Sequence, residues 1–392
     1  MAPIPRLRGY DGPAILSYGF RPFFLLGALY AGLAVLAWIP VFHGELSLAT
    51  AFAPRDWHVH EMLYGFLPAV ITGFLLTAIP NWTGRLPLQG KPLLVLVLAW
   101  IAGRIAVTLS AWIGWIPAMV IDVSFLLLVA AAAGREIVAG RNWRNLKVLG
   151  VLTVLTSGNA VFHVEAHLKG AADIGLRLGL GATVLLVMLI GGRIIPSFTR
   201  NWLARENPGR LPASHGTFDT GSMIAAGAAL VLWVAVPGNP ATGAALLACG
   251  LLQGARLARW AGDRAVRDPL VLGLHVAYAF VPLGFVLVGL AAFGLTPASV
   301  GIHAWSGGAL GVMTLAVMSR ASLGHTGRAL VAGRAVQAIH VLAVVSVVAR
   351  ICAALHPAWG TPLLHVAGLA WAAAFLGFAA AYWGILTRPR VT

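Results

Sequence analysis

The chain has 392 residues, of which 59% are hydrophobic and only 10% are charged. Soluble globular proteins carry about 25% charged residues, so this composition excludes a water-soluble fold and indicates an integral membrane protein. The net charge of +15 could indicate a nucleic-acid partner, but the basic residues lie in short connectors between apolar segments. We therefore expect the lipid bilayer as a partner and no nucleic acid.

Apolar stretches follow one another along the chain, each about 20 residues long and so able to cross a bilayer core of about 30 Å. The predicted helices are about 19–42, 57–80, 91–112, 115–134, 146–167, 174–196, 218–237, 241–260, 270–293, 299–320, 333–355 and 359–386. The connectors are short and no strand pattern is evident. The predicted fold class is an all-α polytopic membrane protein of about twelve transmembrane helices in one membrane domain, 1–392.

The basic residues concentrate on alternate connectors. One alternating set of segments holds Arg6, Arg8, Arg85, Lys91, Arg135, Arg141, Arg144, Lys147, Arg200, Arg205, Arg210, Arg256, Arg259, Arg264, Arg267, Arg328, Arg334, Arg388 and Arg390. The opposite set holds little beyond Arg55, Lys169 and Arg177. The positive-inside rule then places both termini in the cytoplasm, as an even number of helices also requires. A bacterial inner membrane, contacted through its anionic lipids, is the expected location.

Internal repeats are visible in the spacing of polar motifs. His60 precedes Thr83-Gly84-Arg85 by the same interval at which His303 precedes Thr326-Gly327-Arg328. The segment Ile79–Thr83 matches Ile195–Thr199, and the segment around Arg104 is similar to that around Arg350. We predict three pseudo-repeats of four helices, roughly 15–140, 141–265 and 266–390.

Chance similarity among Leu/Ala/Gly-rich segments is the alternative to these repeats. The matched positions include polar residues that membrane helices use sparingly, which favours the repeats. Three blocks of four helices resemble the plan of the haem–copper oxidase large subunit, although a likeness of fold alone does not establish function.

Most of the twelve histidines fall near the predicted periplasmic side. His58 and His60 are two residues apart on a helix and so point to different faces. His163 and His167 are four apart, on one face, and could share one metal ion. Imidazole suits haem iron, copper or zinc, and Glu61 could hold the second ring nitrogen. Each histidine could instead be a hydrogen-bonding residue of the helix bundle.

His60 and His303 occupy equivalent repeat positions at one predicted depth, so we predict that they clamp one haem from its two faces. The predicted metal ligands are His58, His60, His163, His167 and His303. Arg104 and Arg350 lie in the outer halves of their helices, where each needs an anion. Haem propionates are the predicted partners of these two cofactor-binding arginines, and Asp122, Glu61 and Glu165 are the competing ones.

Four segments resemble the NnrS family, the haem- and copper-containing membrane proteins of the bacterial nitric-oxide response. They are Tyr18–Phe24 (YGFRPFF), Trp57–Met62 (WHVHEM) running on to Gly73–Arg85 (GFLLTAIPNWTGR), Arg193–Thr199 (RIIPSFT) and Met318–Arg328 (MSRASLGHTGR). The resemblance implies twelve helices, haem, copper and protection against nitrosative stress. It does not say which histidine holds which cofactor.

The leading hypothesis is a b-type haem protein of the inner membrane that handles nitric oxide or its iron adducts, with redox chemistry as the expected route. Haem–copper oxidases place copper ligands on the sixth and seventh helices, where this chain has no histidine. A copper centre would therefore be built from His58, His163 and His167, and oxygen reduction is disfavoured. The alternatives are a quinol-dependent oxidoreductase, such as a nitric oxide reductase, and a transporter without tightly bound haem. Whether the protein turns over as an enzyme stays open.

Overall fold

The computed structural model describes residues 10–391. In that range all the regular elements are helices, and twelve spans are long and apolar enough to cross a membrane. This confirms the predicted all-α membrane fold. Arg6 and Arg8, which contribute to the predicted orientation, lie outside the described residues.

The first six spans begin at α1 and end with α8. Their helices are α1 (Phe20–Phe42), α2 (Pro54–His60), the π-helical segment η2 (Glu61–Phe66), α3 (Leu67–Thr83), α4 (Lys91–Thr108), α6 (Trp115–Ala139), α7 (Leu146–Lys169) and α8 (Asp173–Glu206). α2, η2 and α3 together form one span, Pro54–Thr83. A single-turn helix, α5 (Ser110–Ile113), joins α4 to α6.

The last six spans run from α9 to α15. Their helices are α9 (Thr217–Ala235), α10 (Pro240–Ala258), α11 (Pro269–Ala292), α12 (Ala298–His303), the π-helical segment η5 (Ala304–Val312), α13 (Met313–His325), α14 (Arg334–Leu355) and α15 (Gly360–Thr387). Short 3-10 turns lie at Ala14–Leu16, Trp143–Asn145, Gly262–Arg264 and Pro357–Trp359.

Several helices begin or end at residue types that suit those positions. α2, α10 and α11 begin at Pro54, Pro240 and Pro269, where the missing N–H costs nothing because no intrahelical acceptor exists. The Asp268 side chain accepts from the backbone N–H of Leu270 at 2.9 Å and so caps α11. α3 ends at Gly84, whose φ of 71° is the left-handed conformation that favours glycine.

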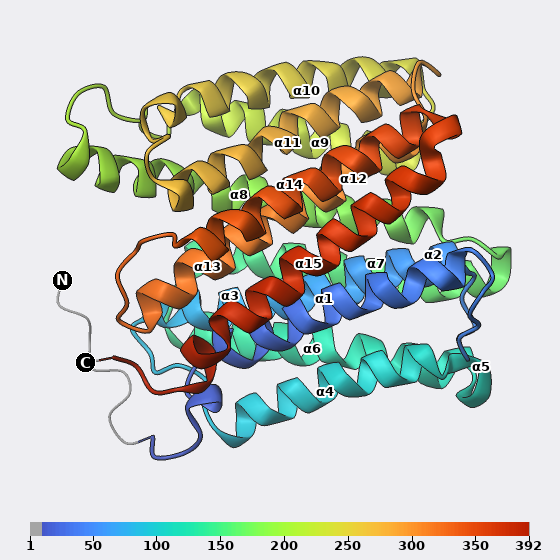
Figure 1. Cartoon of the computed structure of the whole chain (residues 1–392), viewed down its shortest axis with the longest axis horizontal. Coiled ribbons are helices and arrows are strands. Elements are labelled where there is room, and N and C mark those ends of the chain that lie inside the picture. The colour runs from blue at the N-terminus through green and yellow to red at the C-terminus, as the bar shows by residue number, and fades with distance from the viewer. Residues whose placement is uncertain (1–9, 392) are drawn as a thin grey trace. The chain divides into compact units, whose positions relative to one another are not determined.

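The helices group into two compact units. Unit 1 takes the described residues up to Gly179, together with Ala321–Ala329 and the residues from Phe378 onward. Unit 2 takes Leu180–Arg320 and Leu330–Gly377. In unit 1, α3 packs on α1 and α6, and α6 also packs on α4 and α7 (Figure 1). In unit 2, α11 packs on α10 and α12, and α14 packs on α12. These units do not coincide with the three predicted four-helix blocks, whose arrangement stays a prediction.

Apolar side chains cover the outside of both units. Leu98 on α4 is 53% exposed, Leu127 on α6 is 56% exposed and Val231 on α9 is 68% exposed. Such side chains on spanning helices face lipid, which does not penalise exposed apolar surface. The units therefore suit a bilayer environment.

Residues at matching positions in the predicted repeats share local geometry. The hydroxyls of Thr83, Thr199 and Thr326 each donate to the carbonyl four residues earlier, at 2.9, 2.8 and 2.6 Å. His60 and His303 are each the last residue of a short α-helix that continues as a π-helix. π-helical turns inside α-helices are rare and are frequent at functional sites. Both histidines thus lie where an α-helix changes to a π-helix.

Candidate metal centre

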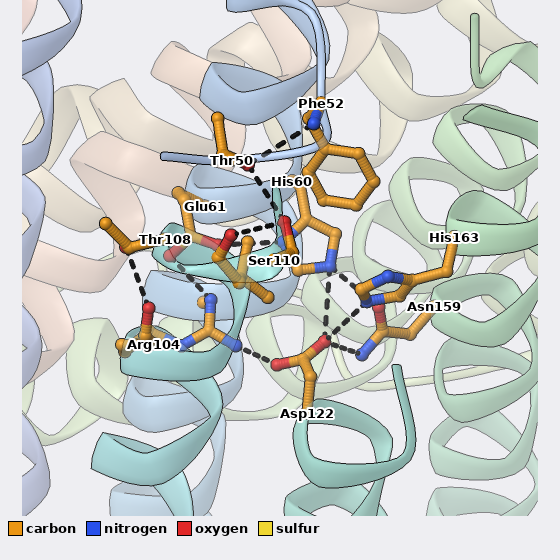
Figure 2. Close-up of polar contacts among 12 residues, drawn as sticks. Thr50, Phe52, His60, Glu61, Arg104, Thr108, Ser110, Asp122, Asn159 and His163 are labelled. Atoms are coloured by element: carbon orange, nitrogen blue, oxygen red, sulfur yellow. Dashed lines mark hydrogen bonds and ion pairs between the residues drawn. The ribbon is translucent and has the colours of Figure 1, made fainter. Parts of the chain in front are cut away.

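His60 lies at the centre of a polar cluster buried in unit 1. Its ring is fully buried, and both ring nitrogens contact oxygen atoms (Figure 2). Nδ1 lies 2.8 Å from Glu61 Oε1, and Nε2 lies 2.9 Å from Asn159 Oδ1. Nε2 also lies 3.2 Å from Asp122 Oδ2. The side chains of the consecutive residues His60 and Glu61 lie against each other where the π-helical turn begins.

Arg104 joins the two carboxylates of the cluster. Its guanidinium donates to Glu61 Oε2 at 2.6 Å and to Asp122 Oδ1. Tyr30 donates its hydroxyl to the same Glu61 oxygen. Glu61 and Asp122 are two of the partners predicted for Arg104, and the structure places both against its guanidinium. A buried arginine is stable in a membrane when its charge is paired in this way.

Asp122 Oδ2 faces the remaining side chains. Asn159 donates its amide to this oxygen at 2.8 Å, and His163 Nε2 lies 3.2 Å from it. His60, Asp122 and His163 each offer one ligand atom, and these atoms lie within 4.8 Å of one another. Two imidazoles and one carboxylate are a donor set that suits iron, copper or zinc. Among the described residues this is the group able to hold a metal ion.

The cluster occupies one depth because its helices contribute residues from the same end of their spans. His60 lies six residues into Pro54–Thr83, and His163 lies six residues before the end of Trp143–Lys169. At 1.5 Å per residue both rings lie about 9 Å from that helix end. Arg104 lies near the end of α4 and Asp122 near the start of α6. By the predicted topology this end faces the periplasm.

With a neutral His60 ring the charged groups of the cluster sum to one negative charge, which a cation near His60 would balance. Glu61 and Asp122 supply two negative charges, and Arg104 supplies one positive charge. Asn159 must turn its amide nitrogen toward Asp122, so its oxygen faces His60. An imidazole between two acceptors donates from both nitrogens and then carries the missing charge. The site thus has the electrostatics of a cation site.

The space around His60 suits a small ion better than a macrocycle. The ring nitrogens lie within 3.2 Å of the oxygens of Glu61, Asn159 and Asp122. Phe162 and Tyr64 lie against the same ring at centroid distances of 5.3 and 5.5 Å. A porphyrin on either nitrogen would require these contacts to open. The predicted haem between His60 and His303 stays a prediction.

Two of the predicted metal ligands lie elsewhere in unit 1. The ring of His58 stacks on Trp38 at 4.2 Å, on another face of α2 from His60. The ring of His167 stacks on Trp115 at 4.4 Å, whereas His163 faces Asp122. Neither His58 nor His167 belongs to the three-residue group. Their role as ligands stays a prediction.

His303 and Arg350 belong to unit 2. His303 Nδ1 donates to the Ser299 carbonyl at 2.7 Å, which places the ligand lone pair of the neutral ring on Nε2. Position 304, which follows His303 as Glu61 follows His60, is an alanine. Arg350 is half-buried in α14 and forms no ion pair with any described residue. The unit 2 histidine therefore has a different electrostatic environment from His60.

Sequence reasoning missed several members of the cluster. The sequence indicates Asp122 only as a partner for Arg104, and it does not point to Asn159 or Tyr30. One available signal was the four-residue spacing of Asn159 and His163, which places both polar side chains on one face of an apolar helix. A polar pair on such a face predicts a partner on the neighbouring helix.

A protein-family model described as NnrS protein matches residues 14–390, nearly the whole chain. No curated protein matches the chain. The family match agrees with the resemblance carried by the four sequence segments.

Proposed function

The chain belongs to the NnrS family, and on that premise we propose that it holds a metal ion between His60, Asp122 and His163. Membership supports a membrane protein of the nitric-oxide response. The observation that carries the proposal is the approach of three ligand atoms to within 4.8 Å of one another, all on buried side chains. Buried ionisable groups inside spanning helices are costly and mark functional sites.

Residues around the three ligands hold them by hydrogen bonds, as the neighbours of metal ligands do in known metal sites. Glu61 holds Nδ1 of His60, which orients the ring and leaves Nε2 toward Asp122. Arg104 and Asn159 fix the Asp122 carboxylate from two sides. A metal ion between the ring nitrogens would take over the balancing charge that the His60 proton supplies in its absence. Copper is the ion that the family resemblance favours.

The position of the proposed ion suggests how the protein could act on nitric oxide. Held by His60, Asp122 and His163, a copper or iron ion would supply redox chemistry and the capacity to bind a small diatomic molecule. The protein would orient that ion near the outer face, exclude water from it and surround it with aromatic rings. We propose that it serves the handling of nitric oxide or its iron adducts.

A b-type haem on His303 is a second candidate, favoured by one observation. The Nδ1–H donates to a backbone carbonyl at 2.7 Å, which is the arrangement that orients an axial histidine. Arg350 lies on α14, which packs on α12, and its charge would suit a propionate. This candidate is independent of the His60 centre.

Metal quantification on the purified full-length protein tests the proposal. We expect about one equivalent of non-haem transition metal per chain, lost in His60→Ala and in His163→Ala. His58→Ala and His167→Ala are matched controls from the same helices and should keep the metal. Retention of the metal in both cluster variants would overturn the assignment.

An absorption spectrum of the same samples tests the haem candidate. A Soret band that disappears in His303→Ala and persists in His60→Ala is the expected result. Loss of the band in both variants would instead support a haem shared by these two histidines. A protein without a Soret band would remove the candidate.

A further inference from the structure

The segment that joins α1 to α2 crosses the cluster. Most of its residues between His43 and Ala53 are exposed, but the side chain of Phe52 turns inward (Figure 2). The Phe52 ring lies 5.0 Å from the ring of His60 and 5.1 Å from that of His163. It also meets Phe162 edge-on at 5.6 Å. One aromatic ring on an exposed connector thus covers both imidazoles.

Hydrogen bonds fasten this connector to α5. Ala51 donates its backbone N–H to Ser110 Oγ at 2.8 Å, and the Thr50 hydroxyl lies 3.3 Å from the same atom. The backbone N–H of Ala111 donates to the Ala49 carbonyl at 2.9 Å. Ser110 in turn donates to the Val107 carbonyl. Ser110 therefore holds the two residues that precede Phe52, and it serves as the anchor of the connector.

We propose that Phe52 determines access from the outer face to His60 and His163. Phe52 has no side-chain donor or acceptor, so it contributes contact and exclusion of water but no ligand atom. An incoming metal ion or small molecule would pass where the ring now lies, with the connector moving away from Ser110. The inference rests on the proposed metal function for its biological purpose, but not for its geometry.

Phe52 controls rates under this proposal, and it leaves the equilibrium affinity of the centre unchanged. Removing the ring eliminates its contacts with three other rings, which should speed both uptake and loss of the ion by about tenfold. Because both rates change together, the fraction of protein that holds metal at equilibrium should stay within about twofold of wild type. A ring that served only to stabilise the fold would not give this pattern.

The test uses the full-length protein in detergent and three variants. Phe52→Ala removes the ring, Ser110→Ala removes the anchor, and Phe42→Ala is the matched control. Phe42 lies at the end of α1 on the same side and is 49% exposed, and its ring contacts Trp38 and His43. The first readout needs no metal: the rate at which diethyl pyrocarbonate modifies each histidine, resolved by peptide mass spectrometry. The second is the rate at which a copper(I) chelator removes copper from the loaded protein.

We expect Phe52→Ala to be modified about tenfold faster at His163, Ser110→Ala to be intermediate and Phe42→Ala to match wild type. His60 is not used in this readout, because diethyl pyrocarbonate attacks a ring nitrogen with a free lone pair and both nitrogens of His60 face acceptor oxygens. A wild-type rate at His163 in Phe52→Ala would overturn the inference. So would an equal rise at His275, a buried histidine of unit 2, because that result would mean a loosened fold. If modification is faster but the wild-type protein holds no metal, the proposed function fails while the access role of Phe52 stands.

Discussion

Replacement of Arg104 by methionine should destabilise the protein strongly. Arg104 pairs with two carboxylates that are almost completely buried, Glu61 and Asp122. Methionine keeps much of the side-chain volume but leaves both negative charges without their shared partner. Breaking a buried ion pair by removing one partner costs about 3–5 kcal/mol. Because two carboxylates lose a partner, we expect the cost to lie toward the upper end of this range.

Thermal unfolding in detergent measures this cost. A change of 1 kcal/mol shifts the Tm of a unit of this size by about 2–4 °C, so Arg104→Met should lower Tm by roughly 6–20 °C. Arg85→Met is the matched control, because Arg85 pairs with Glu136 at 2.5 Å while 46% of its side chain is exposed. Exposed pairs contribute about 0–1 kcal/mol, so this control should shift Tm by roughly 4 °C at most.

A charge-compensating variant separates the loss of pairing from the loss of packing. Arg104→Met combined with Glu61→Gln and Asp122→Asn removes all three charges, and it should recover at least half of the lost Tm. An Arg104→Met protein that unfolds at the wild-type temperature would refute the reasoning. A triple variant less stable than Arg104→Met would also refute it, because packing would then account for the effect.

Three further predictions follow from the same cluster and its helices. Gly65→Ala places a Cβ against the Arg104 guanidinium, so it should lower the metal content, whereas Gly150→Ala, which meets no atom within 4 Å, should not. Asn159→Leu removes one hydrogen bond to Asp122 and one to His60, and competition with a chelator should show metal affinity reduced by about 10- to 100-fold. Gly84→Ala forces a side chain into φ 71°, so unfolding should become easier by about 1–2 kcal/mol, and an unchanged Tm would contradict the left-handed cap.

Hydrophobic length was sufficient to predict the helices, because every predicted span agrees with an observed one to within a few residues at most ends. The largest difference is α8, predicted to end at 196 and observed to continue to Glu206. The helix continues through Pro196 into a polar segment that leaves the apolar layer. The length of an apolar stretch predicts the part of a helix that crosses the bilayer core, but not a polar extension of that helix.

His60 and Glu61 were predictable because they are adjacent in the sequence, and His163 because it lies four residues before His167 in an apolar segment. Asp122 and Asn159 were not predicted as members of the site, since α6 and α7 are apolar around most of their surface and hydropathy does not fix how each helix is rotated about its axis. The π-helical turn at Glu61–Phe66 was equally hidden, because it changes the rotation of α3 relative to α2 without a change in composition. Rotation about the helix axis decides which side chains meet.

His60 and His303, which the predicted repeats pair, share a local backbone but not a chemical environment. Each ends a short α-helix that continues as a π-helix. Glu61 follows the first, however, and Ala304 follows the second. His60 is therefore held at both nitrogens by acceptor oxygens, a setting that needs a cation. His303 is instead held at Nδ1 by a neutral carbonyl. Two positions with the same backbone and different neighbouring charge are suited to different ligands, so each histidine must be tested separately.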